Sequence, residues 1–141
     1  MVIKLKSEHP KVIQVHGEVA YPKECCGLML GRLVKREKHI VELLPADNAR
    51  EEDQQHNRFL ISPQTMFQAE KSARDKGMDV LGFYHSHPNA EARPSQFDLD
   101  HAWPFYSYII ISVLQGQAGA MTCWKLSDDR ASFSPEDIQS S

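Results

Sequence analysis

The spacing of apolar positions predicts three helices in this chain. The first carries a stripe close to helical periodicity, namely Val12, Ile13, His16, Val19 and Ala20. Each of the three opens with a serine, whose hydroxyl can cap a helix N-terminus, and the second has proline directly after its serine. The expected boundaries are Ser7 to Tyr21-Pro22, Ser62-Pro63 to about Lys76 followed by Gly77, and Ser95 to about Trp103 before Pro104.

Runs of apolar and β-branched residues predict the strands. They are Cys25–Leu33, His39–Leu44, Arg58–Ile61, Asp79–His87, Tyr106–Leu114 and Ala118–Leu126. A charged turn at Lys35–Lys38 makes the first two a hairpin, and the polar segment Ala46–Asn57 is expected to be a loop. Beyond Asp128 the chain is polar, with a final short strand near Ala131–Phe133.

Helices that interleave with strands predict an α/β fold, a mixed β-sheet flanked by helices. No repeat, low-complexity tract or linker divides the chain, so residues 1–141 are expected to form a single domain. Its core is expected to span about residues 7–127, followed by a polar C-terminal tail.

Composition narrows the class of protein. A net charge of −3 and the absence of a basic stripe argue against a nucleic-acid partner. No apolar run approaches the roughly 20 residues that span a bilayer, and the first residues lack the apolar core of a signal peptide. Cys25, Cys26 and Cys123 form no CxxC pair, so buried thiols in a cytoplasmic protein are expected.

The most informative residues are two histidines one position apart, His85 and His87, at the end of an apolar run. Side chains at i and i+2 of a strand share a face, so both imidazoles can reach one ion. Pro88 ends the strand because it cannot donate to the ladder. Past a short loop, Ser95 starts a helix and Asp98 lies about one turn later, where its carboxylate can close the ion from the other side. Two imidazoles and one carboxylate leave a fourth position for water, as in catalytic zinc sites.

Each of these residues also has an ordinary structural explanation. Histidine pairs occur in strands by chance, and Ser95 followed by Asp98 is also a helix cap with an acidic first turn. The joint pattern is much harder to attribute to chance, because it combines His-x-His-Pro, Ser-x-x-Asp and a separate upstream glutamate, Glu24.

This joint pattern resembles the signature of the JAMM (MPN+) zinc metalloproteases, His-x-His-x(7)-Ser-x-x-Asp. In this chain, residues 88–94 are the seven residues between the second histidine and the serine. The segment Pro22-Lys23-Glu24-Cys25-Cys26-Gly27-Leu28 also resembles the one that carries the family's catalytic glutamate. The resemblance spans roughly Pro22 to Trp124. It implies the MPN architecture, which is similar to that of cytidine deaminases, and it is greatest to the small stand-alone prokaryotic members.

The resemblance implies one catalytic zinc ion (Zn2+) held by His85, His87 and Asp98. Zinc lowers the pKa of a bound water to about 7 and polarises a carbonyl. Glu24 is then implied as the general base that passes a proton from this nucleophilic water to the leaving amine. Ser95 is implied as the donor to the developing oxyanion. Without the resemblance, Glu24 would be interpreted as a solvated residue at a strand start and Ser95 as an N-cap.

The resemblance also implies a substrate class. Family members hydrolyse peptide or isopeptide bonds after the C-terminal Gly-Gly of ubiquitin or ubiquitin-like proteins. Members that discriminate ubiquitin chains carry long insertions, and only the Ala46–Asn57 loop offers a comparable surface here. The expected partner is therefore a small ubiquitin-like or sulfur-carrier protein, whose extended tail can add to a sheet edge. The oligomeric state is left open.

Two other functions match parts of the pattern. A non-catalytic MPN scaffold that assembles complexes would typically lack the zinc ligands, and all of them are present here. A zinc nucleoside deaminase needs His-x-Glu followed by Pro-Cys-x-x-Cys. The segment around Glu24 does not match that motif, so the deaminase is set aside.

Four polar residues near the motif are assigned lesser roles. His101 follows Asp98 by three positions and is interpreted as a surface histidine, with an outer partner of the site or a second metal ligand as alternatives. Ser86 faces away from the two histidines and is interpreted as structural. Asp100 and Arg93 are expected to line the cleft.

Overall fold

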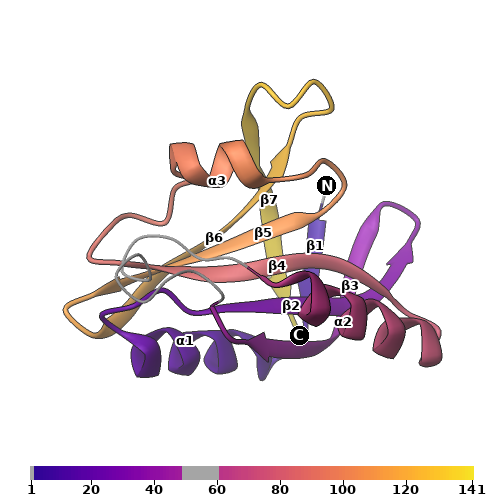
Figure 1. Cartoon of the computed structure of the whole chain (residues 1–141), viewed down its shortest axis with the longest axis horizontal. Helices are drawn as coiled ribbons and strands as arrows, with labels where there is room; N and C mark the ends of the chain where they lie inside the picture. Colours follow the sequence, from indigo (N-terminus) through magenta and orange to yellow (C-terminus); the bar gives the residue numbers. More distant parts are fainter. Residues whose placement is uncertain (1, 49–60) are drawn as a thin grey trace.

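The structure is a computed structural model that describes residues 2–48 and 61–141. The helices are interspersed among the strands of these residues (Figure 1). In chain order they are β1 (Val2–Leu5), α1 (His9–Ala20), β2 (Cys26–Val34), β3 (Glu37–Ala46), α2 (Pro63–Asp75), β4 (Asp79–Pro88), α3 (Gln96–His101), β5 (Ser107–Leu114), β6 (Gln117–Leu126) and β7 (Phe133–Ser140). No helix within the described ranges is long and apolar enough to cross a membrane.

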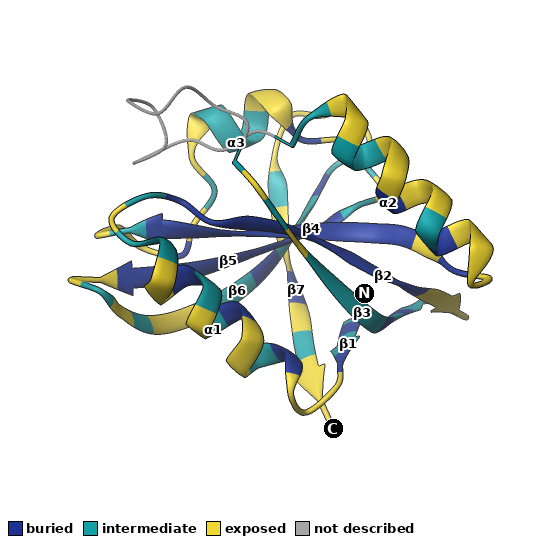
Figure 2. Cartoon of the chain, turned by 60° about the horizontal axis from the view of Figure 1, so that its bottom comes forward, coloured by how far each residue is buried: buried dark blue, intermediate teal, exposed yellow. Residues whose placement is uncertain are grey.

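The strands form one closed barrel in the order β1-β3-β2-β4-β5-β6-β7. β1 runs parallel to both β3 and β7, β4 runs parallel to β5, and the other neighbours are antiparallel. Helices α1 and α2 lie on opposite sides of β4 (Figure 2). The predicted mixed sheet flanked by helices is confirmed, whereas its closure into a barrel was not predicted.

The two strands that complete the barrel are the ones that local sequence pattern missed. β1 precedes the first predicted helix, and most of the segment expected to be a polar tail forms the strand β7, Phe133–Ser140. The two pair in parallel across almost the whole chain, with Val2 opposite Asp137. Local periodicity carries no signal for such distant pairing. The short strand expected near Ala131–Phe133 was therefore wrong in position and extent.

Helix α1 presents a different face and a different cap from those predicted. Its N-cap is Glu8 rather than Ser7, without a side-chain hydrogen bond. Its buried residues are His9, Ile13 and Gly17. Of the predicted stripe, Ile13 is buried as expected, whereas Val12 and Val19 are 40% and 78% exposed, so their inclusion was wrong. A Cβ at Gly17 would meet the Val113 side chain at 3.1 Å, and its absence lets the helix approach β5 closely.

Helix α2 has the ends that the sequence predicted. The Ser62 hydroxyl accepts a hydrogen bond from the Thr65 backbone N–H at 3.1 Å. At the other end Gly77 has a φ of +69°, and the Met78 N–H donates to the Ala73 carbonyl at 2.7 Å. This is a Schellman ending, in which glycine adopts the left-handed conformation without a steric penalty. It directs the chain straight into β4.

Lys38 lies in strand β3 and is 1% exposed, so its assignment to a charged turn was wrong. Its ammonium donates to the Phe105 carbonyl and, at 2.9 Å, to the Ser107 hydroxyl. That hydroxyl donates in turn to the Glu136 carboxylate at 2.5 Å. This buried network, Lys38–Ser107–Glu136, joins β3, β5 and β7 from within the barrel.

Two sequence predictions fall on or near residues 49–60. The predicted loop Ala46–Asn57 begins too early, because β3 continues to Ala46, and its residues 49–57 lie outside the described part of the chain. The strand predicted over Arg58–Ile61 also lies outside it, apart from Ile61, which is not in a strand.

All three cysteines are free and buried, as expected. Burial raises the pKa of Cys25 to about 11 and that of Cys26 to about 12, and it raises the pKa of Cys123 as well. The thiols therefore ionise in the unfolded chain, near pH 9, before they ionise in the fold. The stability that they contribute is complete below that pH and is lost as the pH rises through 11 to 12.

We expect the free energy of unfolding to fall by at least about 2 kcal/mol between pH 9 and 10.5. Lys38 makes the fold more stable as the pH rises over this range, because burial lowers the pKa of its ammonium to about 8. This single group offsets only part of the effect of the three thiols. Urea unfolding under reducing conditions measures the change. A Cys26→Ala variant should show a shallower dependence on pH, and constant or rising stability over this range would contradict the expectation.

Candidate metal centre

Strand β4 presents His85 and His87 on one face. Their side chains alternate with that of Ser86, which points to the opposite face, as strand geometry requires. His85 is 1% and His87 8% exposed. β4 is hydrogen-bonded to β2 on one side and to β5 on the other, so the backbone under both imidazoles is fixed.

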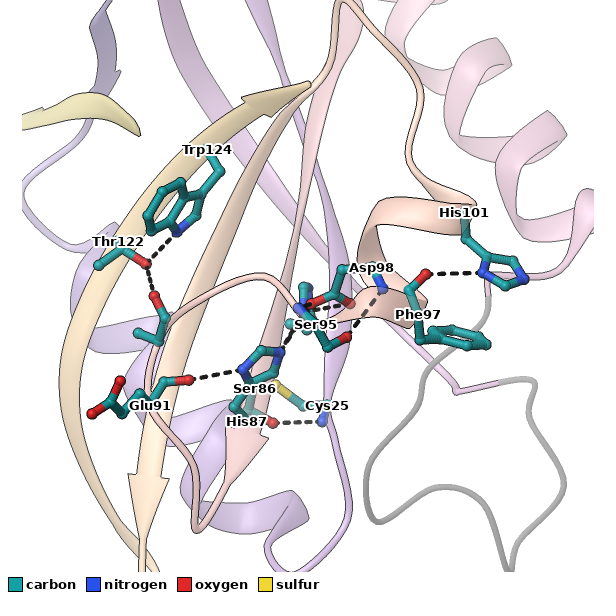
Figure 3. A network of polar contacts seen from close by, with 12 residues as sticks. Cys25, Ser86, His87, Glu91, Ser95, Phe97, Asp98, His101, Thr122 and Trp124 are labelled. Carbon is teal, nitrogen blue, oxygen red and sulfur yellow. Dashed lines mark hydrogen bonds and ion pairs between the residues drawn. The ribbon is translucent and has the colours of Figure 1, made fainter. Parts of the chain in front are cut away.

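The first turn of α3 presents Asp98 to these imidazoles. Ser95 is the N-cap: its hydroxyl accepts from the Asp98 N–H at 3.1 Å, and its own N–H donates to Asp98 Oδ2 at 2.9 Å. This reciprocal capping box holds the carboxylate in place (Figure 3). The predicted helix start at Ser95 is confirmed, while the helix ends at His101 rather than near Trp103.

The three side chains converge on one point. Nε2 of His85 lies 3.1 Å from Nε2 of His87 and 3.3 Å from Asp98 Oδ1, and His87 Nε2 lies 3.2 Å from Asp98 Oδ2. Among the described residues, this is the group of histidine, cysteine and acidic side chains whose ligand atoms gather within 4.8 Å. Zinc bonds of 2.0–2.1 Å in a tetrahedron place neighbouring ligand atoms about 3.3 Å apart. The residues therefore fit a zinc ion with a fourth position left open.

The protonation equilibria of His85 and Asp98 favour metal binding. Burial lowers the pKa of His85, which leaves a neutral imidazole. Burial alone would raise the pKa of Asp98, but the adjacent His85 and His87 hold it well below its usual range. The His87 Nδ1 lies 2.9 Å from the Glu91 carbonyl oxygen and donates to it, which leaves Nε2 as the lone-pair nitrogen. For His87, burial acts to lower the pKa of the imidazole. The hydrogen bond to Asp98 and its negative charge outweigh that effect, so the pKa of His87 is raised.

Glu24 lies in the segment that precedes β2 and is 5% exposed. Its charge contributes to raising the pKa of His87, so the carboxylate acts on the same cluster. Its backbone carbonyl accepts a hydrogen bond from the Asn48 side chain at 3.4 Å. The structure thus brings His85, His87 and Asp98 into contact and makes Ser95 the cap of Asp98, while Glu24 is buried in the segment before β2.

The comparison with known families decides the identity of this fold. The sequence matches the family described as prokaryotic homologues of the JAB domain over residues 6–127, most of the chain. The chain belongs to the prokaryotic JAB family. The JAMM resemblance inferred from the motif is thereby confirmed at the level of the family.

Three comparisons place this JAB domain among known proteins. It is 32% identical over 92 residues to the desampylase of Haloferax volcanii, covering 64% of this chain and 63% of that protein. It is 30% identical over 89 residues to the probable TtuB-protein conjugate cleaving protease of Thermus thermophilus, covering 63% of this chain and 55% of that protein. A solution structure from Desulfitobacterium hafniense has a TM-score of 0.85 and 28% identity, covering 100% of this chain and 93% of the other.

The lesser residues of the motif are distributed differently from the predictions. His101 stands apart from the ligand cluster of this JAB domain, because its Nδ1 donates to the Phe97 carbonyl at 2.9 Å and its ring stacks on Phe97 at 4.0 Å. His101 is exposed, as interpreted, and it also lines the cleft described below. Arg93 pairs with Glu91 at the surface and Asp100 accepts from Gln96, and neither lines the cleft described next, so that prediction was wrong.

A cleft of about 500 Å³ opens beside the cluster, and sequence reasoning did not anticipate it. His85 and Asp98 are among its lining residues, and most of the others are apolar. Its aromatic residues are Phe83, Phe97, Trp103, Phe105, Tyr106, Tyr108 and Phe133. The concentration of aromatic residues between positions 97 and 108 was the available signal, but Phe83 and Phe133 join them only through the fold.

Proposed function

We propose that this protein is a zinc-dependent isopeptidase that hydrolyses the bond after the C-terminal Gly-Gly of a ubiquitin-like or sulfur-carrier protein. The observation that carries the proposal is the convergence of His85, His87 and Asp98 at tetrahedral spacing in a JAB domain. The names of the Haloferax desampylase and the Thermus conjugate-cleaving protease support a hydrolase that acts on protein conjugates.

The chain's own residues divide the work. His85, His87 and Asp98 would hold the zinc, which when bound supplies a Lewis acid and a water with a pKa of about 7. Glu24 takes the proton and delivers it to the leaving amine. The Ser95 oxygen already accepts from the Asp98 N–H, so its hydroxyl hydrogen is the one left to donate to the substrate carbonyl oxygen.

The aromatic cleft is our proposed site for the substrate's C-terminal tail. It reaches His85 and Asp98, and neither Glu24 nor Ser95 is part of its lining. The acyl side of the scissile bond would therefore approach from the cleft, with apolar residues ahead of Gly-Gly packed on its aromatic walls. The leaving amine would face Glu24, as its role as proton donor requires.

We further propose that residues 1–141 act as one domain in the cytoplasm, with a protein substrate rather than nucleic acid or a membrane. The three buried free thiols suit a reducing compartment.

The test pairs zinc stoichiometry with cleavage of a sulfur carrier extended beyond its Gly-Gly. We expect about one zinc in wild type and in Glu24→Gln, and a fall of at least about 10²-fold in cleavage for the variant, because general-base catalysis typically contributes that much. Mass spectrometry identifies the cleaved bond. Wild-type protein without zinc would contradict the site, and zinc without cleavage would leave two explanations, a different substrate or the non-catalytic scaffold.

A further inference from the structure

Ser86, between the two histidines, is fully buried and is bonded to the chain next to Glu24. Its hydroxyl accepts a hydrogen bond from the Cys25 backbone N–H at 2.8 Å (Figure 3). Its backbone N–H donates to the Cys25 carbonyl at 3.2 Å. Cys25 directly follows Glu24 in the sequence. Both bonds therefore fix the backbone beside the glutamate to the strand that carries His85 and His87.

The hydroxyl takes the place of a backbone acceptor. The regular pairing of β2 with β4 ends with Cys26 opposite His85. One step further, a regular antiparallel pair would exchange two backbone hydrogen bonds between Cys25 and Ser86. Only one of these two backbone hydrogen bonds is present, from the Ser86 N–H to the Cys25 carbonyl. The Cys25 N–H donates to the Ser86 hydroxyl instead of the Ser86 carbonyl. The ladder ends there, and the residue that leaves it first is Glu24.

We propose that Ser86 is a positioning residue that sets where the Glu24 carboxylate stands relative to the metal ligands, by holding the backbone N–H of Cys25. The inference rests on the proposed function, since it takes Glu24 to be the base. Cys25 and Ser86 are 3% and 0% exposed, so water does not replace the hydroxyl when it is removed. A buried N–H without an acceptor is unfavourable, so the Cys25 segment would shift to find another one.

The same two segments share a second contact, which supplies a matched control. The Tyr21 hydroxyl and the Asn89 side-chain amide exchange hydrogen bonds at 3.0 and 2.8 Å. Tyr21 precedes Glu24 by three residues and Asn89 follows His87 by two, but this contact is solvent-exposed. Tyr21→Phe removes a link between the same segments without leaving a buried donor, so we expect a change in kcat of less than about two-fold.

The test compares wild type with Ser86→Ala in the zinc-loaded protein. We expect unchanged zinc stoichiometry, a KM within two-fold of wild type and a kcat lowered about 10–100-fold, as for other outer partners of metal sites. In a Glu24→Gln background the same change should lower residual cleavage less than two-fold, because Ser86 acts through Glu24. Equal losses in both backgrounds, or loss of zinc, would show a merely structural role and overturn the inference.

Amide hydrogen exchange gives a second readout that needs no residual activity. The Cys25 amide should exchange at least about ten-fold faster in Ser86→Ala, while the amides of Ile109–Ile111 in β5 remain protected. A Cys25 amide that stays protected would overturn the inference. If Glu24→Gln cleaves as fast as wild type, the proposed function fails. If Glu24→Gln is inactive and Ser86→Ala retains wild-type kcat, the inference alone fails.

Discussion

Asp98→Asn should bind substoichiometric zinc and lose cleavage activity by about 10³-fold or more. The carboxylate is the one anionic ligand of the cluster, and its oxygens lie 3.2 and 3.3 Å from the two imidazole nitrogens. An asparagine keeps the size of the side chain and an oxygen that can accept the Ser95 N–H, so the cap of α3 is retained. A neutral amide is a much weaker zinc ligand than a carboxylate. The loss should exceed the roughly 10–100-fold typical for removal of an outer partner.

Zinc stoichiometry, kcat/KM and thermal unfolding of the variant together separate ligation from folding. The matched control is Asp100→Asn, which removes a carboxylate of the same helix whose bond runs to Gln96 at the surface. We expect the control to keep its zinc and to cleave within two-fold of wild type. An Asp98→Asn protein that holds one zinc and cleaves normally would show that the carboxylate is not a ligand.

Lys38→Met should destabilise the fold by about 3–5 kcal/mol, because removal of one partner leaves a buried charge uncompensated. The Lys38 ammonium is the cation of a network in which the Ser107 hydroxyl links it to the 9%-exposed Glu136. The network ties β3 and β5 to the last strand of the barrel, β7. Methionine fills nearly the same volume, so the loss reflects charge rather than a cavity.

The double variant Lys38→Met/Glu136→Gln tests that explanation. It removes both charges, and we expect it to recover most of the lost stability, since neutral replacements of a buried pair are often well tolerated. Lys4→Met is the control for a lysine in an exposed pair, 3.4 Å from Glu37, and should lose less than about 1 kcal/mol. Urea unfolding at pH 7 measures all three. If Lys38→Met were as stable as Lys4→Met, the buried network would contribute nothing.

The ligand cluster could be predicted because its geometry is local. The alternation of side chains along a strand places His85 and His87 on one face whatever surrounds them. The capping box that starts α3 depends only on the identities and spacing of Ser95 and Asp98. The caps of α2 were predictable for the same reason. Periods of two and of 3.6 residues are properties of the neighbouring backbone, so a single sequence reveals them.

The closure of the barrel, the buried network and the aromatic cleft could not be predicted in this way. Lys38 looks like a turn residue until β5 and β7 supply Ser107 and Glu136 around its ammonium. The cleft needs Phe83 and Phe133, from β4 and β7, to line the same cavity as residues of α3. Each of these features joins residues far apart in the chain, and their pairing depends on the packing of whole elements rather than on neighbouring side chains.

The sequence by itself determined the family, the chemistry of the candidate ligands and their placement on one strand and one helix start. Only the tertiary structure decided that Glu24 is buried, that Ser86 holds the backbone next to it, and which face of α1 meets the barrel. The physical reason is the separation along the sequence of the residues that interact. A ligand motif depends on backbone geometry over a few residues, whereas the place of a general base depends on contacts between residues that only the complete fold brings together.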